Sequence, residues 1–178
     1  MSRNLDPLAS LNASRRRNGL WLLPLGALAS SFAYVLSIVN GTLNPVDALL
    51  SPMLFVGFLV MALLLWLHRI SIATVELVAV VLLSVYNLGN LYYMGLSGEL
   101  SKVGFSASAL WSTTIYPLAF LLLSRERAIR VSAAYYVAGL LGGMVSLWLH
   151  PPNLNALNSV VQFYLANLVF LALINVYA

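Results

Sequence analysis

Six stretches of about 20 apolar residues make up most of this sequence, and short polar or turn-forming segments separate them. A helix needs about 20 mostly apolar residues to cross the roughly 30 Å hydrocarbon layer of a bilayer. Strands of a membrane β-barrel are about 10 residues long and alternate in polarity, a pattern that these stretches lack. We therefore predict an all-α fold, an integral membrane bundle of six transmembrane helices. The predicted spans are about 20–39, 48–67, 72–96, 105–123, 131–149 and 159–178.

The composition agrees with a protein that lies in lipid. Of its 178 residues, 61% are hydrophobic and only 8% are charged, whereas soluble domains are roughly 45–50% apolar and about 25% charged. A water-soluble globule of this composition could not cover its surface with polar side chains. The chain has no Cys, which excludes disulfides, thiolate metal sites and cysteine nucleophiles.

The distribution of basic residues predicts the orientation. Eight of the nine are Arg, and all eight fall in the amino-terminal tail or in the loops after the second and fourth spans. Six crossings place these segments on one side of the membrane, and the other side keeps only Lys102. Because cytoplasmic loops carry an excess of Lys and Arg, we predict that both termini are cytoplasmic in a multi-pass protein of the bacterial inner membrane. The basic loops are too short to read nucleic acid, so the expected partner is the lipid bilayer and not a nucleic acid.

Residues 1–19 form the predicted cytoplasmic basic tail. Asp6 is a candidate N-cap and Pro7 suits the first position of a helix, so the tail is either a short helix on the inner leaflet or a disordered segment. The apolar run after the arginines continues unbroken to Val39. This length favours an uncleaved membrane anchor over a cleaved signal peptide.

The few ionisable residues give little support to catalysis. His68 and His150 lie at opposite surfaces of the predicted bundle, so they cannot share a metal ion or form a dyad. No two carboxylates are placed for general acid–base work, and the P-loop, H-E-x-x-H and G-x-S-x-G motifs are absent. We therefore expect no enzymatic activity, no metal site and no cofactor in this segment.

Glu76 is the only ionisable residue within a predicted span, about one turn from the inner surface. An intramembrane acid is a functional candidate, for example as a proton relay. The alternative is an ion pair near the interface with Arg69, Arg125 or Arg127, and the shallow depth of Glu76 favours this alternative.

Amide and aromatic side chains gather in the predicted outer half of several spans. Asn87 and Asn90 share one face of the third span, and we expect them to point into the bundle because amides that face lipid are costly. An apolar pocket with a few amide and aromatic groups is typical of a small-molecule site. Alternatively, these groups form interhelical hydrogen bonds or belong to the aromatic belt at the membrane surface. The predicted ligand-binding residues are Tyr34, Asn87, Asn90, Tyr93, Trp111, Gln162 and Asn167.

Two backbone features bear on movement and packing. Pro117 lies past the middle of the fourth span, where it removes a helical hydrogen bond, and we predict a hinge there. Gly139 and Gly143 form a G-x-x-x-G pair in the fifth span. Small residues at this spacing let two helices approach closely, within the bundle or across a homodimer.

The junction between the fourth and fifth spans, LLLSRERAIRVSAAYY, carries Leu121–Leu123, Arg125, Arg127, Arg130 and Ser132. With six short-looped spans, this junction resembles that of the amino-terminal membrane sensor modules of bacterial diguanylate cyclases and histidine kinases. The cyclase G-G-D/E-E-F signature and a phosphoacceptor His segment are absent. The resemblance therefore implies an output domain beyond Ala178, and we expect the chain to continue there because the last span ends without a polar cap or cation.

We thus expect a transmembrane sensory module that binds an unknown small molecule in an outward-facing pocket. By the resemblance, it would signal through the last span to a dimeric cytoplasmic output domain in cyclic di-GMP or two-component signal transduction. A homodimer would form through the fifth or sixth span. The alternatives are a small inner-membrane transporter and a structural membrane subunit.

Overall fold

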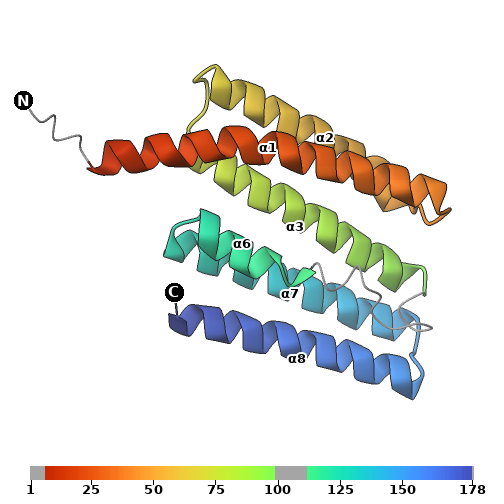
Figure 1. Cartoon of the computed structure of the whole chain (residues 1–178). Coiled ribbons are helices and arrows are strands. Elements are labelled where there is room, and N and C mark those ends of the chain that lie inside the picture. The colour runs from red at the N-terminus through yellow and green to blue at the C-terminus, as the bar shows by residue number, and fades with distance from the viewer. Residues whose placement is uncertain (1–6, 99–111, 178) are drawn as a thin grey trace, which may run out of the picture. The chain divides into compact units, whose positions relative to one another are not determined.

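The computed structural model describes residues 7–98 and 112–177, and the described chain is entirely helical apart from its turns (Figure 1). It forms two compact units, Met1–Ala79 and Val80–Ala178, and the boundary falls inside one helix. The helices are α1 (Pro7–Val39), α2 (Pro45–Trp66), α3 (Ile72–Leu96), α6 (Ile115–Leu122), α7 (Arg125–Leu149) and α8 (Leu154–Tyr177).

Four of the described helices are long and apolar enough to cross a membrane. They comprise Asn12–Val39, Pro45–Trp66, Ile72–Leu96 and Arg125–Leu149, and a shorter apolar stretch covers Val160–Ala172 of α8. The predicted all-α class and the presence of membrane-spanning helices are therefore confirmed. The count of six spans and the cytoplasmic position of both termini stay predictions.

In the first unit, α1 and α2 pack side by side in opposite directions (Figure 1). Two glycines of α1 make this close packing possible. A Cβ on Gly19 would lie 3.2 Å from Leu65 Cδ2, and one on Gly26 would lie 3.3 Å from the Phe58 ring. The buried side chains on the two helices recur every three or four residues, the spacing of one helix face. They are Leu23, Ala27, Leu54, Phe58, Met61 and Leu65.

Three helices end in the same kind of turn, with a residue in the left-handed region just after the C-cap. Gly41 (φ 65°) follows α1 and Gly98 (φ 75°) follows α3, whereas His68 (φ 58°) occupies this position after α2. At α1 and α2, the two amides after the cap donate back to carbonyls of the last turn, as in a Schellman motif. His68 therefore adopts a conformation that glycine adopts more readily.

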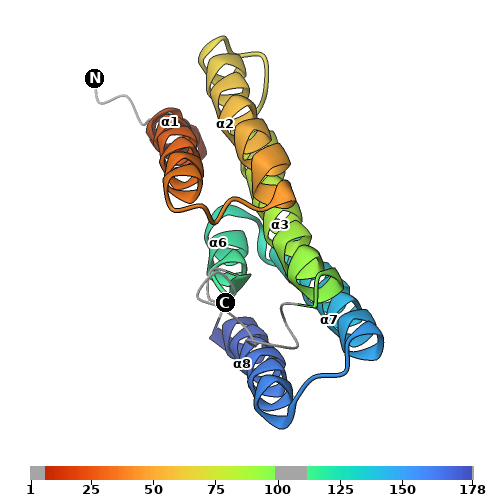
Figure 2. The ribbon, with the colours of Figure 1, turned by 90° about the vertical axis from the view of Figure 1, so that its right-hand side faces the viewer.

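In the second unit, α7 is the helix on which the others assemble. Its buried residues are small or hydroxylated and follow a spacing of three or four: Ala128, Ser132, Tyr135, Gly139, Gly143 and Ser146. Figure 2 shows α6 beside α7 and α8, and the carboxyl-terminal part of α3 contacts α7 through side-chain hydrogen bonds. The apolar core comprises one cluster of Val80, Ala119 and Ala128 and another of Ile115, Tyr116 and Tyr135.

Several helices extend beyond the predicted spans. α1 begins at Pro7, so the predicted tail is helical from that point and continuous with the first span. No proline lies between Pro7 and the apolar run, and Arg, Leu and Ala favour the helical state. The N-cap assigned to Asp6 lies outside the described residues.

The helices that follow the fourth predicted span also begin earlier than expected. α7 starts at Arg125, so the basic segment predicted as a loop forms its first turns, and α8 starts at Leu154. Ser124 precedes α7 in an extended conformation, which is typical of an N-cap. Of the predicted span 105–123, the described part forms only Ile115–Leu122, and residues 105–111 lie outside the described residues.

Pro117 is the third residue of α6, in the first turn of that helix. A backbone N–H in the first turn has no carbonyl acceptor within the helix, so the proline breaks no hydrogen bond of α6. Residues 105–111 of the predicted span lie outside the described residues. The hinge at Pro117 therefore stays a prediction.

Candidate functional site

Tyrosine rings from two neighbouring helices pack against glycines of α7. Gly142 faces the ring of Tyr92 on α3, and Gly143 faces the ring of Tyr164 on α8. A Cβ at either glycine would overlap the ring, whereas one at Gly139 would make an ordinary contact of 3.8 Å with Leu88. Close packing within the bundle, predicted for the pair Gly139 and Gly143, is therefore confirmed at Gly143 and not at Gly139.

Each of these tyrosines donates a hydrogen bond to the backbone of α7. Tyr92 Oη lies 2.7 Å from the carbonyl oxygen of Ala138, and Tyr164 Oη lies 2.7 Å from that of Gly139. The close approach at the glycines gives the hydroxyls access to carbonyl oxygens that a larger side chain would shield. The tyrosines thus fix α3 and α8 to α7 through polar as well as apolar contacts.

Two further side chains of α7 and its end bind the last turn of α3. Ser146 Oγ donates to the carbonyl of Gly95 at 3.1 Å, and His150 Nε2 lies 3.0 Å from the carbonyl oxygen of Leu96. These carbonyls belong to the last turn of α3, beyond the regular hydrogen bonds of the helix, and that of Gly95 also accepts a hydrogen bond from the Gly98 amide. His150 therefore has a structural partner at the end of α3.

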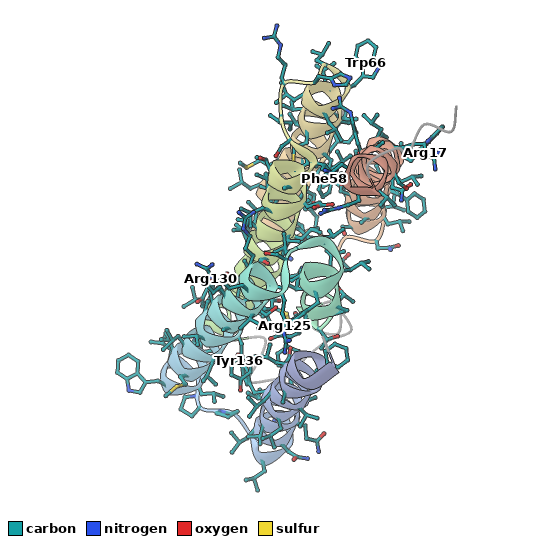
Figure 3. The ribbon with its side chains drawn as sticks, turned by 90° about the vertical axis from the view of Figure 1, so that its left-hand side faces the viewer. Arg17, Phe58, Trp66, Arg125, Arg130 and Tyr136 are labelled. Atoms are coloured by element: carbon teal, nitrogen blue, oxygen red, sulfur yellow. The ribbon has the colours of Figure 1, made fainter. Side chains whose placement is uncertain are left out.

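A small cavity lies beside the contact between Tyr164 and Gly139, and residues of α3, α6, α7 and α8 line it. Its volume is about 10 Å³, which is the space of about one water molecule. Figure 3 labels Tyr136, one of the α7 residues around it. The lining residues are Leu91, Ser112, Tyr116, Tyr135, Tyr136, Gly139, Phe163, Tyr164 and Asn167.

The hydroxyl of Tyr135 is the least satisfied polar group of this cavity. Tyr135 is only 5% exposed, and its Oη makes no hydrogen bond of good geometry to the described residues, although the Ser112 hydroxyl is close to it. The Tyr116 ring packs edge-on against Tyr135, with ring centroids 5.7 Å apart. Leaving a buried donor unsatisfied costs about 1–3 kcal/mol.

Of the predicted ligand-binding residues, Asn167 lines this cavity and is 2% exposed. Gln162 lies on the same helix but is exposed. Tyr34 belongs to the first unit, and Trp111 lies outside the described residues. Within the described part of the second unit, Asn167 is thus the one predicted ligand-binding residue that lines the cavity.

The predicted amides satisfy part of their hydrogen-bonding capacity within their own helices. Asn87 Nδ2 donates to the carbonyl of Leu83 at 2.9 Å, and Asn90 Nδ2 donates to that of Tyr86 at 3.3 Å. Both side chains are half-buried, as is Tyr93, and none of the three lines the cavity. That Asn87 and Asn90 line an outward-facing pocket stays a prediction.

Most of the residues that form the cavity were not predicted from the sequence, among them Ser112, Tyr116, Tyr135 and Tyr136. One signal was present in the sequence. The small and hydroxyl residues of α7 recur at a spacing of three or four, and this spacing indicates one helix face on which other helices pack closely.

Glu76 forms an ion pair, but not with the expected arginines. Its Oε1 accepts a hydrogen bond of 3.1 Å from Arg15 Nε, and its Oε2 accepts a second one from Arg15 Nη2. The guanidinium therefore binds both carboxylate oxygens, and Glu76 is 8% exposed. The expected partner Arg69 is exposed.

Where the structure describes the chain, no three His, Cys, Asp or Glu side chains gather to hold a metal ion. Comparison of the chain with family models, with curated proteins and with solved structures finds no match. The helices therefore define the protein as a helical membrane protein, and a small tyrosine-lined cavity lies in its second unit.

Proposed function

We propose that the chain is a transmembrane sensory module in which α8 is the moving element. A small polar molecule would bind at the tyrosine-lined cavity and displace α8. The displacement would pass along α8 to a cytoplasmic output domain, in a homodimer of the inner membrane. The observation that carries the proposal is the polar character of the contact between α8 and the rest of its unit.

The inward-facing stripe of α8 has the buried residues Val160 and Asn167 and the half-buried residues Tyr164 and Leu171, at intervals of three or four. Two of these four side chains are polar, and one of them makes a hydrogen bond to a backbone carbonyl of α7. A contact of this kind is worth about 0.6–1.7 kcal/mol within a membrane. Displacing such a helix therefore costs less free energy than displacing a helix that buries a continuous apolar stripe.

The cavity couples binding to movement. It has room for about one water molecule, so a larger molecule enters only if α8 moves away from α7. The buried hydroxyl of Tyr135 offers such a molecule a hydrogen bond, and satisfying it recovers about 1–3 kcal/mol. A ligand shifts an equilibrium only through its different affinities for two states, and here the displaced state alone would bind it.

Spin-label distances between α7 and α8 test the proposal. The chain has no Cys, so the exposed residues Val137 and Leu168 can be replaced by cysteine and labelled without a background. We expect two distance populations in nanodiscs. Phenol, a ring with one hydroxyl, serves as the probe molecule. It should increase the fraction of molecules that show the longer distance.

Two variants distinguish this mechanism from general disorder. Tyr164→Phe removes the hydrogen bond to Gly139 and should increase the displaced population several-fold. Tyr135→Phe removes the unsatisfied hydroxyl from the packed state and should decrease that population. A single unchanged distance in the wild type and in both variants, with and without phenol, would overturn the proposal.

A further inference from the structure

An open hollow of about 470 Å³ lies between α1 and α2 in the first unit. Its walls are apolar: Leu20, Trp21, Ala62, Leu63 and Trp66. The two tryptophans are 72% and 64% exposed, although large aromatic side chains are usually buried in a folded protein. In a membrane, such a hollow is filled by lipid.

Positive charge surrounds one end of this hollow. Arg17 lies one turn before Trp21 on α1, and Arg69 follows the last turn of α2. The neighbouring Arg16 donates a hydrogen bond to the carbonyl of Leu65, which places Arg17 at the level of Trp66. Figure 3 labels Arg17 on α1 and Trp66 at the end of α2.

The charges of Arg17 and Arg69 are not neutralised within the described part of the chain. Both side chains are exposed, and neither forms an ion pair with a described residue. The acidic residue Glu76 is occupied by Arg15. The other described acid of this unit, Asp47, lies in the first turn of α2, at the opposite end of that helix.

We propose that the hollow and these two arginines form a binding site for a phospholipid with an anionic headgroup. The acyl chain would occupy the hollow between Trp21 and Trp66. The guanidinium groups of Arg17 and Arg69 would bind the phosphate and the negative headgroup, since Arg matches phosphate oxygens with two parallel hydrogen bonds. An aromatic belt alone accounts for the level of the tryptophans, but not for a hollow with unpaired arginines at its end.

Quenching of tryptophan fluorescence by brominated lipids tests this site in the whole chain. Trp111→Phe and Trp148→Phe leave Trp21 and Trp66 as the only tryptophans of the four. Vesicles contain equal amounts of phosphatidylglycerol and phosphatidylcholine, and one of the two lipids carries bromine on its acyl chains. We expect brominated phosphatidylglycerol to quench more strongly, with a relative affinity at least fivefold above that of phosphatidylcholine.

Substitutions then assign the two parts of the site. Arg17→Gln and Arg69→Gln should each lower the preference about fivefold, whereas Arg127→Gln, an exposed arginine of the second unit, should leave it unchanged. Ala62→Phe fills the hollow and should reduce quenching by the anionic lipid. Ala48→Phe, at an exposed position of the same helix, is its matched control.

Three results would overturn the proposal. Equal quenching by the two brominated lipids would mean ordinary contact with bulk lipid. A preference that survives the double variant Arg17→Gln/Arg69→Gln would refute the role of the arginines. Loss of the preference on addition of soluble glycerol phosphate would mean that the headgroup alone is bound. Circular dichroism of each variant verifies that it is folded.

Discussion

Arg15 of α1 and Glu76 of α3, which are 61 residues apart in the chain, form an ion pair in which the guanidinium binds both carboxylate oxygens. The carboxylate is almost completely buried, whereas the arginine side chain is 39% exposed. This contact joins the first helix of the chain to the start of the third. It also gives the only acid within a predicted span a structural role.

Loss of Arg15 should therefore destabilise the first unit. Arg15→Leu leaves a buried carboxylate without a partner, and we expect a loss of about 2–3 kcal/mol in the free energy of unfolding, below the range for fully buried pairs because the arginine is partly exposed. The double variant Arg15→Leu/Glu76→Leu should recover most of this loss. Unfolding by sodium dodecyl sulfate in bicelles, followed by circular dichroism, measures both.

The ion pair between Glu126 and Arg130 is the matched control, because it is exposed on α7 and separated by one turn. Arg130→Leu should change stability by no more than about 0.5 kcal/mol. If Arg15→Leu lowered the free energy of unfolding equally little, the pair with Glu76 would contribute no more to stability than an exposed ion pair.

The glycines of α7 should differ sharply in their tolerance of alanine. Gly143→Ala would place a methyl group within the Tyr164 ring, and Gly142→Ala would do the same at Tyr92. Because both rings are held by hydrogen bonds, each variant should lose about 1–3 kcal/mol through overpacking. The same unfolding assay measures the loss.

Gly139→Ala is the control for these two variants. It adds only a contact of 3.8 Å to Leu88, and alanine favours the helix by about 0.8–1.0 kcal/mol over glycine. It should therefore be neutral or stabilising. Equal losses at Gly139 and Gly143 would contradict the assigned ring contacts.

His68→Gly should stabilise the protein by about 1 kcal/mol. His68 adopts a left-handed conformation (φ 58°) after α2, which costs a side-chain-bearing residue roughly 1–2 kcal/mol relative to glycine. The gain is partly offset by the greater freedom of glycine in the unfolded chain. The reverse effect, a loss of stability, is expected for Gly41→Ala (φ 65°) at the end of α1. If His68→Gly instead destabilised the protein, a contact of the imidazole would contribute more to stability than the left-handed backbone costs.

The orientation predicted from the arginines has a direct test. Green fluorescent protein fused after Ala178 should fluoresce, and alkaline phosphatase fused at the same point should be inactive, because the former folds in the cytoplasm and the latter needs the oxidising periplasm. The opposite pattern would place Ala178 in the periplasm and would refute the cytoplasmic position predicted for the carboxyl end.

Much of the fold follows from the length and the ends of the apolar stretches. α3 begins at Ile72 and ends at Leu96 as predicted, because polar residues flank a single apolar run. α2 begins at Pro45, slightly before the prediction. Asn44 caps it by accepting a hydrogen bond from the amide of Asp47, and this Asn-Pro start is a signal that the sequence itself contains.

The site was harder to predict, because a polar side chain in a helix has more than one way to be satisfied. Asn87 was expected to point into a pocket, but its amide donates to the carbonyl one turn earlier in the same helix. Tyr135 and Tyr116 meet only because α6 and α7 pack together. Periodicity shows which residues of one helix share a face, but not which face of another helix lies opposite.

The tyrosines that bind α7 use acceptors belonging to its backbone. No substitution of Ala138 or Gly139 removes a carbonyl oxygen, whereas any side chain at Gly142 or Gly143 would overlap a tyrosine ring. The selective constraint on this face of α7 is therefore one of volume. The constraint on chemistry falls on the donors, Tyr92 and Tyr164, whose replacement leaves both helices without their anchoring hydroxyls.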